Sequence, residues 1–391
     1  MKLVFKNETF SFEFLRVLGS SIYGGADISE CFTTAARIKD KDFESWYQEW
    51  SATAARIERL ADDCLERGHG VSAREAYLRA CNYYRSAEFF LHIEPDDPRA
   101  AETYAKSLRC FRQALPLLPF PGEEVRIPYE GTTLPGYFFR ADASHEPRPT
   151  LIWHTGYDGT AEEIYIAHAQ PFLQRGYNCL IFEGPGQGQA IRLQGLPFRP
   201  DWEKVVTPVV DYALSRSEVD PRRLALFGLS LGGYLAPRAA AYEHRLAACI
   251  AVDGLFSFSP AAAEQLEGQT EQQATERFEQ LAQEPGMRWA IGQAVFTMQV
   301  TSPGDFRQKM AAYTMAGRAD KITCPTLVCE AEKDHFFPGQ PRKLYDALTC
   351  PKTFMRFTAA EGGEEHGHAG ALALANQRIA DWLDETLSHN A

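Results

Sequence analysis

The sequence predicts an α/β fold with a mostly parallel, eight-stranded sheet, preceded by a helical N-terminal domain and interrupted by a helical cap insertion. Two observations favour this fold class. Apolar residues recur at helical spacing up to about residue 120, and afterwards they form short runs typical of buried strands. Beyond an initial hairpin, these runs alternate with helical stretches, and such strand–helix repeats build parallel sheets with crossover helices.

Residues 1–120 are expected to form the separate helical domain. Trp46 and Trp50 lie at helical spacing within a long apolar stripe. Ser72 is expected to cap the next helix, and Asp97, which precedes a proline, is expected to cap a third. The high density of aromatic residues indicates packing between helices, with part of this surface lining a substrate pocket. A tetratricopeptide-like hairpin that binds another protein is an alternative interpretation, but one hairpin is too few repeats to be stable alone.

Residues 121–391 are expected to form the core that carries the sheet. Its eight predicted strands are 124–129, 134–140, 150–154, 178–182, 224–227, 247–252, 326–330 and 353–357. The helices expected around them are 161–175, 202–215, 234–242, 340–348 and 370–387. A long insertion at about 255–322 interrupts this alternation, and we expect it to form a helical cap over the carboxyl end of the sheet. Trp289, Phe296 and Met298 are its candidate pocket walls, and the alternative for each is a place in the core of the cap itself.

A candidate nucleophile follows the fifth predicted strand. Ser230 lies in the pattern Gly-Leu-Ser-Leu-Gly, between an apolar strand-like run and a helical stretch. This strand–turn–helix context is that of a nucleophile elbow, in which the flanking glycines allow close backbone approach around a strained serine. The helix that begins after Ser230 favours negative charge at its N-terminus. The number and order of the elements match the arrangement of α/β-hydrolases.

The base and the acid of such a site should each follow a later strand, in the chain order serine, acid, histidine. Asp334, just beyond the seventh predicted strand, is the preferred acid, with Glu332 and Asp253 as alternatives. His366, after the last predicted strand, is the preferred base, and His368 is the alternative.

The region around the candidate base also contains potential metal ligands. Glu364, Glu365, His366 and His368 could bind a cation, but their spacing matches no standard cluster, so no metal is expected.

An oxyanion hole needs two backbone N–H groups near the nucleophile. Leu231 is expected to supply one, and the loop after the third predicted strand is expected to supply the other, with Gly156 allowing close approach and Tyr157 as donor. Asp158 in this loop, Glu183 after the fourth strand and His335 beside the acid are further candidates for substrate contact.

The turn 183–188 resembles a dinucleotide-binding turn. It does not lie in the first strand–helix unit of the sheet, and Asp211, at a suitable distance along the chain, falls within a helical run instead of at a strand end. We therefore interpret the turn as a loop at the edge of the site, in which Glu183 is either a pocket carboxylate or a solvated strand end. No cofactor is expected.

The overall composition excludes several classes of protein. The net charge of −12 disfavours binding to nucleic acid or to an anionic membrane. No apolar run is long enough to span a membrane, and no signal peptide is recognised. The nine cysteines are scattered, which favours reduced, mostly buried thiols in a cytoplasmic protein.

Together these motifs resemble the family of 2,6-dihydroxypseudooxynicotine hydrolase. They are more similar still to fungal hydrolases that shorten polyketide chains in melanin-pigment pathways. Besides the elbow, the resemblance rests on four segments and extends over nearly the whole chain: Gly156–Glu163, Glu183–Gly188, Phe198–Glu203 and Glu364–His368.

The resemblance implies a triad of Ser230, Asp334 and His366, an oxyanion loop lined by Tyr157, and a pocket between the core and N-terminal helices. It also implies a homodimer, with residues 1–120 acting as a lid or dimerisation domain. Gly367 departs from the pigment enzymes, in which a cysteine is expected at this position.

The function expected from these observations is hydrolysis of a C–C bond next to a carbonyl group, through an acyl-enzyme. The substrate would be a bulky or aromatic β-diketone or polyketide-like compound of secondary metabolism. The alternatives are a carboxylesterase or lactonase, or an acyl transferase or cyclase that uses the same triad. A non-catalytic binding protein is disfavoured because serine, acid and histidine occur in the right order.

Overall fold

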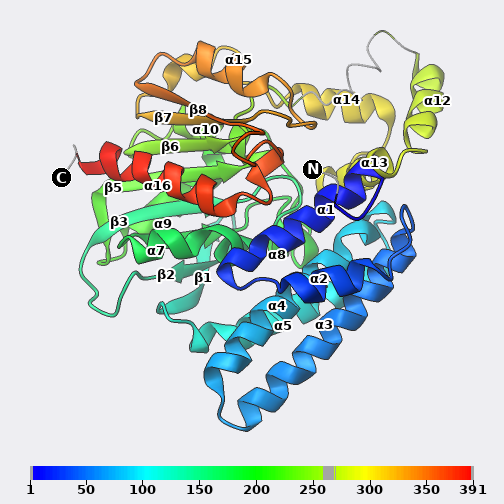
Figure 1. Ribbon diagram of the computed structural model, residues 1–391. Helices are drawn as coiled ribbons and strands as arrows, with labels where there is room; N and C mark the ends of the chain where they lie inside the picture. The colour runs from blue at the N-terminus through cyan, green and yellow to red at the C-terminus, as the bar shows by residue number, and fades with distance from the viewer. Residues whose placement is uncertain (1–2, 259–267, 269, 389–391) are drawn as a thin grey trace. The chain divides into compact units, whose positions relative to one another are not determined.

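The computed structural model describes residues 3–258, 268 and 270–388, and the chain forms two compact units (Figure 1). Part of the predicted cap insertion, 259–267 and 269, lies outside the described residues. The first unit comprises Met1–Pro119, Tyr165–Ala167 and Glu276–Phe296. The second unit comprises Phe120–Ile164, His168–Thr275 and Thr297–Ala391.

The first unit is helical. Its N-terminal helices are α1 (Glu8–Gly19), η1 (Ser20–Tyr23), α2 (Ile28–Ala35), α3 (Phe43–Glu66), α4 (Gly70–Glu88), η2 (Phe89–Ile93), α5 (Pro98–Ala114) and η3 (Leu115–Leu117). Aromatic side chains fill the space between them. Phe90 stacks on Phe10 and Phe43, with ring centroids 4.7 and 4.6 Å apart, and the buried Trp46 indole donates to Ser86 O at 2.7 Å. This aromatic packing confirms the helix-to-helix contacts predicted for the segment.

Most of helix α13 (Pro285–Met298) also belongs to the first unit. Trp289 stacks on Phe89 at 4.4 Å and donates from its indole nitrogen to Phe89 O at 2.9 Å. Gly292 lies so close to η2 that a Cβ there would approach His92 O to 2.4 Å. The insertion between the sixth and seventh strands is therefore shared between the two units.

The second unit contains the predicted eight-stranded sheet, with the order β1-β2-β4-β3-β5-β6-β7-β8. Strands β1 and β2 form an antiparallel hairpin, β2 pairs antiparallel with β4, and the remaining pairs are parallel. The strands are β1 (Gly122–Tyr129), β2 (Thr132–Phe139), β3 (Arg148–His154), β4 (Asn178–Phe182), β5 (Val219–Leu229), β6 (Ala248–Val252), β7 (Thr326–Ala331) and β8 (Lys352–Phe357).

Helices pack along the sheet, α9 against α10 and α7 against α16, so the predicted fold class is confirmed (Figure 1). The helices of the second unit and of the insertion that have not yet been given are α6 (Ala161–Ile164), α7 (Gln170–Gln174), α8 (Gly188–Arg192), α9 (Glu203–Leu214), α10 (Gly232–Ala240), α12 (Glu271–Leu281), α14 (Pro303–Ala311), η5 (Ala319–Lys321), α15 (Gln340–Ala347), η6 (His366–His368) and α16 (Leu372–Ser388).

Two local predictions were wrong. Helix α4 begins at Gly70, two residues before the predicted cap Ser72, and His69 at the N-cap makes no side-chain capping bond. The helix predicted over 161–175 is interrupted by a π-helical turn, Tyr165–Ala169. Pro171, in the first turn of α7, has no backbone N–H for the continuous α-helical bond pattern.

All nine cysteines are free, seven of them buried, as the sequence predicted. Burial raises the pKa of the Cys31 thiol to about 12, which keeps it protonated at neutral pH. Among the described residues, no helix combines the length and the apolar character needed to cross a membrane.

The cap of α5 gives a test of the helical unit. Asp97 accepts a hydrogen bond from Arg99 N at 2.9 Å, as predicted for an N-cap. We expect Asp97→Ala to lower the free energy of unfolding by about 1 kcal/mol, because an N-terminal amide loses its partner. Urea denaturation followed by circular dichroism measures the change. Asp97→Asn, which keeps the acceptor, and Asp96→Ala, which removes an exposed neighbour, are the controls and should change stability little.

Candidate active site

The backbone around Ser230 has the strained geometry expected of a nucleophile elbow. Ser230 connects β5 to α10 and has a φ of +64°, a left-handed conformation that is uncommon for residues other than glycine. Its N–H donates to Val252 O of β6 at 3.1 Å, and its carbonyl accepts from Gly233 N at 2.7 Å. The strained turn is therefore held from both sides by main-chain hydrogen bonds.

Glycines are required where this turn folds back on itself and on β6. A Cβ at Gly228 would lie 2.0 Å from Gly232 O, and a Cβ at Gly233 would lie 2.7 Å from Asp253 O. Both distances are far shorter than any ordinary contact, so larger residues would push the turn away from the sheet. The glycine pattern found in the sequence follows from these close contacts.

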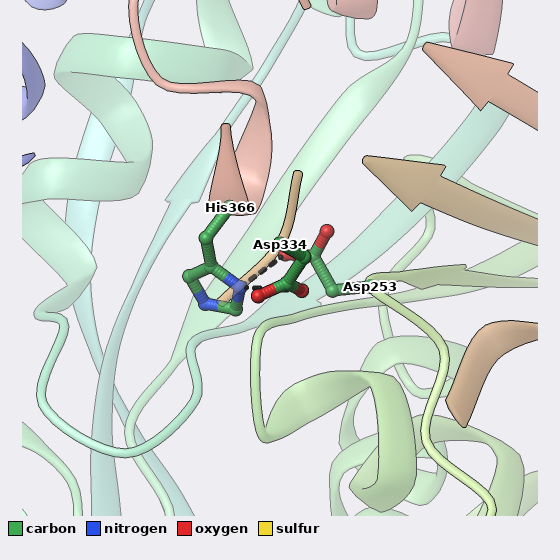
Figure 2. A group of neighbouring side chains, drawn as sticks. All are labelled: Asp253, Asp334 and His366. Carbon is green, nitrogen blue, oxygen red and sulfur yellow. Dashed lines mark hydrogen bonds and ion pairs between the residues drawn. The ribbon is translucent and has the colours of Figure 1, made fainter. Parts of the chain in front are cut away.

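His366 links the serine to a carboxylate. Its Nε2 lies 2.9 Å from Ser230 Oγ, and its Nδ1 lies 2.9 Å from Asp334 Oδ2. Figure 2 shows the imidazole nitrogen directed at the carboxylate. Asp334 is buried and is oriented by the backbone N–H groups of Phe336 and Phe337, which donate to Oδ1 at 2.8 and 3.2 Å. The three preferred residues of the sequence prediction thus form one hydrogen-bonded chain.

A second carboxylate contacts the same imidazole nitrogen. Asp253, the alternative acid of the sequence prediction, follows β6 and places Oδ2 3.1 Å from His366 Nδ1 (Figure 2). The same oxygen accepts a hydrogen bond from Gly367 N at 2.6 Å. One atom from each of the three side chains lies within 4.8 Å of the other two. The structure therefore brings both candidate acids to His366.

These contacts shift the ionisation of all three groups. Burial disfavours the charged imidazole, but the negative charges of Asp253 and Asp334 raise the pKa of His366 to about 9. Burial raises the pKa of Asp253 to about 7, with a further contribution from the charge of Asp334. Asp334 is also buried, but contact with His366 and two backbone N–H groups lowers the pKa of its carboxyl group. Of the two carboxylates, Asp334 is therefore the one that is ionised at neutral pH.

The alternative base has a different environment. His368 is buried, its ring lies against Phe357, and its Nδ1 lies 3.2 Å from Gly363 O. Burial lowers the pKa of His368 to about 3, so it stays neutral. Oε1 of the nearby Glu364 lies 3.8 Å from Lys333 Nζ.

The loop after β3 lies against the nucleophile turn, as expected for an oxyanion hole. A Cβ at Gly156 would lie 2.6 Å from both Leu231 N and Leu229 O. Only a glycine lets this loop approach the amide that follows Ser230 so closely. Leu231 is fully buried, and Tyr157, which follows Gly156 in the loop, is half-buried.

Sequence reasoning missed Gln187, whose side chain forms hydrogen bonds to the backbone of this loop. Its Nε2 donates to Thr155 O at 2.7 Å and to Gly156 O at 3.2 Å, while its Oε1 accepts from Gly184 N at 3.1 Å. Because C=O and N–H point in opposite directions in a trans peptide, holding Gly156 O also orients the N–H of Tyr157. The Gly-x-Gly-x-Gly pattern around Gln187 was the available signal.

Glu183 is a buried carboxylate, not a solvated strand end. Its two oxygens accept hydrogen bonds from Ala161 N at 2.9 Å and Gln189 N at 2.7 Å, and they fill the space where a Cβ at Gly188 would lie. Burial, together with the charge of nearby Glu162, raises the pKa of Glu183 to about 8. The bond from Ala161 N connects the turn 183–188 to the start of α6, and the bond from Gln189 N connects it to α8.

The remaining pocket candidates are distributed over both units. His335 is exposed beside Phe336, Asp158 is half-buried in the loop after β3, and Met298 is buried in the second unit. Trp289 and Phe296 belong to the first unit, where they contact Phe89 and His92. The first three candidates therefore belong to the same unit as Ser230.

Aromatic rings also line the site within the second unit. Phe336 and Phe337 make edge contacts with His366, at centroid distances of 4.8 and 5.3 Å. Phe258 contacts both Phe337 and Tyr157, at 5.9 and 5.6 Å. These rings extend from the imidazole to the predicted oxyanion loop. Phe258 was not predicted because it lies in the irregular start of the insertion.

Comparison with known proteins agrees with this geometry. Residues 151–382 match the Alpha/beta hydrolase family. "Hydrolase LUC6" of Fusarium sp is 37% identical over 412 residues, covering 99% of this chain and 98% of the relative. "20-hydroxy-prefusarin hydrolase FUS2" of Gibberella moniliformis is 34% identical over 420 residues and covers 99% of each chain. The chain therefore belongs to the alpha/beta hydrolase family.

Solved structures support the fold over the same length. The crystal structure of 2,6-dihydroxy-pseudo-oxynicotine hydrolase superposes with a TM-score of 0.75 at 23% identity, covering 94% of this chain and 95% of that one. The structure of AbyA5 gives a TM-score of 0.65 at 18% identity, covering 98% and 100%. The resemblance predicted from the sequence motifs is confirmed, and it includes the helical N-terminal region.

Gly156 allows a direct test of the close approach between the two loops. We expect Gly156→Ala to destabilise the protein by about 1–3 kcal/mol, because the added methyl group overlaps backbone atoms that cannot move independently. Thermal denaturation measures this loss. Gly70→Ala is the control, since a Cβ there meets only Leu117 Cδ2 at 3.7 Å. Equal stability of the two variants would contradict the close packing of Gly156 on the nucleophile turn.

Proposed function

We propose that this protein is a serine hydrolase that cleaves a C–C bond next to a carbonyl group, in a β-diketone or polyketide-like substrate. The observation that carries the proposal is the hydrogen-bonded chain from Ser230 through His366 to Asp334. This chain supplies a nucleophile, a base and an orienting carboxylate within one buried site. Asp253, at the same imidazole nitrogen, adds to the charge that favours protonated His366.

The first half of the reaction forms an acyl-enzyme. His366 takes the hydroxyl proton of Ser230 on Nε2 as Oγ attacks the substrate carbonyl carbon. Asp334 holds the proton on Nδ1 and stabilises the imidazolium that forms. The N–H groups of Leu231 and Tyr157 bind the oxyanion of the tetrahedral intermediate. Collapse of this intermediate breaks the C–C bond, and the electron pair leaves with the departing carbon as an enolate.

The second half returns the enzyme to its starting state. His366 donates the proton on Nε2 to the enolate carbon or, through water, to its oxygen, which releases a ketone. A water molecule then gives a proton to His366 while its oxygen attacks the acyl carbonyl. Collapse of the second intermediate releases a carboxylic acid and returns the proton to Ser230.

The aromatic surroundings support a bulky, conjugated substrate. The rings of Phe337 and Phe258 connect the imidazole to Tyr157, and Phe336 contacts the imidazole beside them. Flat π-systems pack favourably on such rings. The relative FUS2 is named for a hydrolase of 20-hydroxy-prefusarin. By analogy with that name, we propose a fungal-type secondary metabolite as the substrate class.

The proposal is tested with two substrate classes. We expect turnover of aryl 1,3-diketones, with formation of one acid and one ketone detected by chromatography. Ser230→Ala should abolish this turnover and also abolish covalent labelling by a fluorophosphonate probe, because both need the Ser230 oxygen. Efficient hydrolysis of activated esters without diketone cleavage would contradict the proposed C–C hydrolase and support a carboxylesterase or lactonase. Labelling that persists in Ser230→Ala would contradict the assignment of the nucleophile.

Gln187 gives a second test, specific to the oxyanion loop. We expect Gln187→Met to lower kcat by about ten- to a hundredfold with little change in KM, because the Tyr157 N–H is less well oriented in the transition state. Steady-state kinetics on the best substrate measure this split. Gln194→Met is the matched control, since the Gln194 amide donates to Thr133 O instead. A rise in KM with kcat unchanged would argue that Gln187 supports substrate binding only.

A further inference from the structure

His366 Nδ1 has one proton to share between two carboxylates. Asp334 Oδ2 lies 2.9 Å and Asp253 Oδ2 lies 3.1 Å from this nitrogen (Figure 2). The two distances are nearly equal, and both carboxylates are buried. In a triad of the usual kind a single carboxylate receives this hydrogen bond. Asp253 is therefore an additional acidic group at the nitrogen whose proton the orienting carboxylate holds.

The backbone holds Asp253 in this position at an energetic cost. Its φ of +56° is left-handed, a conformation that Asp and Asn tolerate better than most residues do. On one side its carbonyl oxygen packs against Gly233 of the nucleophile turn, and on the other side its carboxylate accepts from Gly367 N. Strained residues held in this way are concentrated at functional sites.

We propose that Asp253 is a positioning residue that shares the Nδ1 proton of His366 with Asp334, and thereby sets the pH range over which His366 is charged. Its role in turnover depends on the proposed function, but its effect on the charge of His366 follows from the contacts alone.

The charges around the imidazole support this role. Asp253 interacts with His366, Asp334, the N–H of Gly367 and the thiol of Cys329. The charge of Asp158 also acts on His366 and favours its protonated form. Asp253 Oδ1 is buried and has no hydrogen-bond partner among the described residues. Two buried carboxylates this close together repel each other, and a proton on the shared imidazole relieves the repulsion. The cluster of Asp253, Asp334 and His366 therefore retains a proton at a pH at which a triad with one carboxylate would release it.

The retained proton has a chemical use in the proposed reaction. The neutral imidazole is needed to activate Ser230, whereas the imidazolium is needed to protonate the departing carbon. Two carboxylates stabilise the imidazolium, which favours the acid step over the base step near neutral pH. The neutral imidazole therefore forms only when the cluster loses a proton to solvent, and the raised pKa of His366 moves this loss to alkaline pH. We therefore expect activity to increase up to an alkaline pH.

The decisive experiment measures the charge of His366 without any substrate. The protein carries Ser230→Ala and histidine labelled with carbon-13 at Cε1, and NMR follows the ring signals from pH 5 to 10. The spectrum of a His366→Gln variant identifies the His366 signal among those of the ten histidines. Because this titration needs no turnover, failure of the proposed reaction leaves its outcome readable.

We expect the His366 signal to titrate near pH 9 in the parent protein and about one to two pH units lower with Asp253→Asn. Asparagine fits the positive φ and keeps an acceptor for Gly367 N, so this variant should fold, and thermal denaturation checks that it does. Asp381→Asn is the control, because it removes a carboxylate of α16 that pairs with Arg175. An unchanged titration with Asp253→Asn would overturn the proposal.

An activity profile provides the second readout. With Asp253→Asn the acidic limb of kcat/KM should move to lower pH by the same amount. Asp334→Asn should lower the plateau, because the Nδ1 proton then keeps only the more distant Asp253 carboxylate as its acceptor. A lower plateau with an unmoved acidic limb would give Asp253 a structural role only and overturn the proposal. Near-normal activity with Asp334→Asn would instead make Asp253 the principal acid, which also overturns it.

Discussion

The site depends on how closely the chain can approach itself at the carboxyl ends of β3, β5 and β6. Ser230 reaches its left-handed conformation because its N–H bonds to Val252 O and because the glycines around it have no Cβ. The loop after β3 and Asp253 pack against the same turn so closely that one added methyl group, at Gly156 or at Gly233, would overlap backbone atoms. The register of the sheet and the backbone strain at the turn therefore together fix the position of Ser230.

Much of the fold could be predicted from sequence because its signals are local. Buried parallel strands are continuous apolar runs, and each was found near its observed position. Asp97 was recognised as a cap because its side chain acts on a neighbouring N–H. Ser72 shows the limit of this reasoning: a capping residue predicts a helix start only when no earlier turn is favourable, and α4 begins at Gly70. Chain order was enough to select Ser230, Asp334 and His366 as candidates.

What could not be predicted depends on contacts between distant segments. From the sequence, Asp253 and Asp334 are alternative candidates for the acid, because each follows a strand. In the structure both carboxylates lie at His366 Nδ1. Gln187 was missed because its partners, Thr155 and Gly156, lie about thirty residues away. No local pattern distinguishes a glutamine that holds a loop through hydrogen bonds from one that faces solvent. Burial and hydrogen bonding, which only the folded chain defines, make that distinction.

The way the first unit is assembled also constrains the order of biosynthesis. Its helices α1–α5 are translated first, but α13 is translated only after six strands of the sheet. While the ribosome is still completing the sheet, the N-terminal helices lack the Trp289 indole that stacks on Phe89. The packing of the helical unit is therefore completed only after six strands of the sheet have been synthesised, so its last contacts form late in translation.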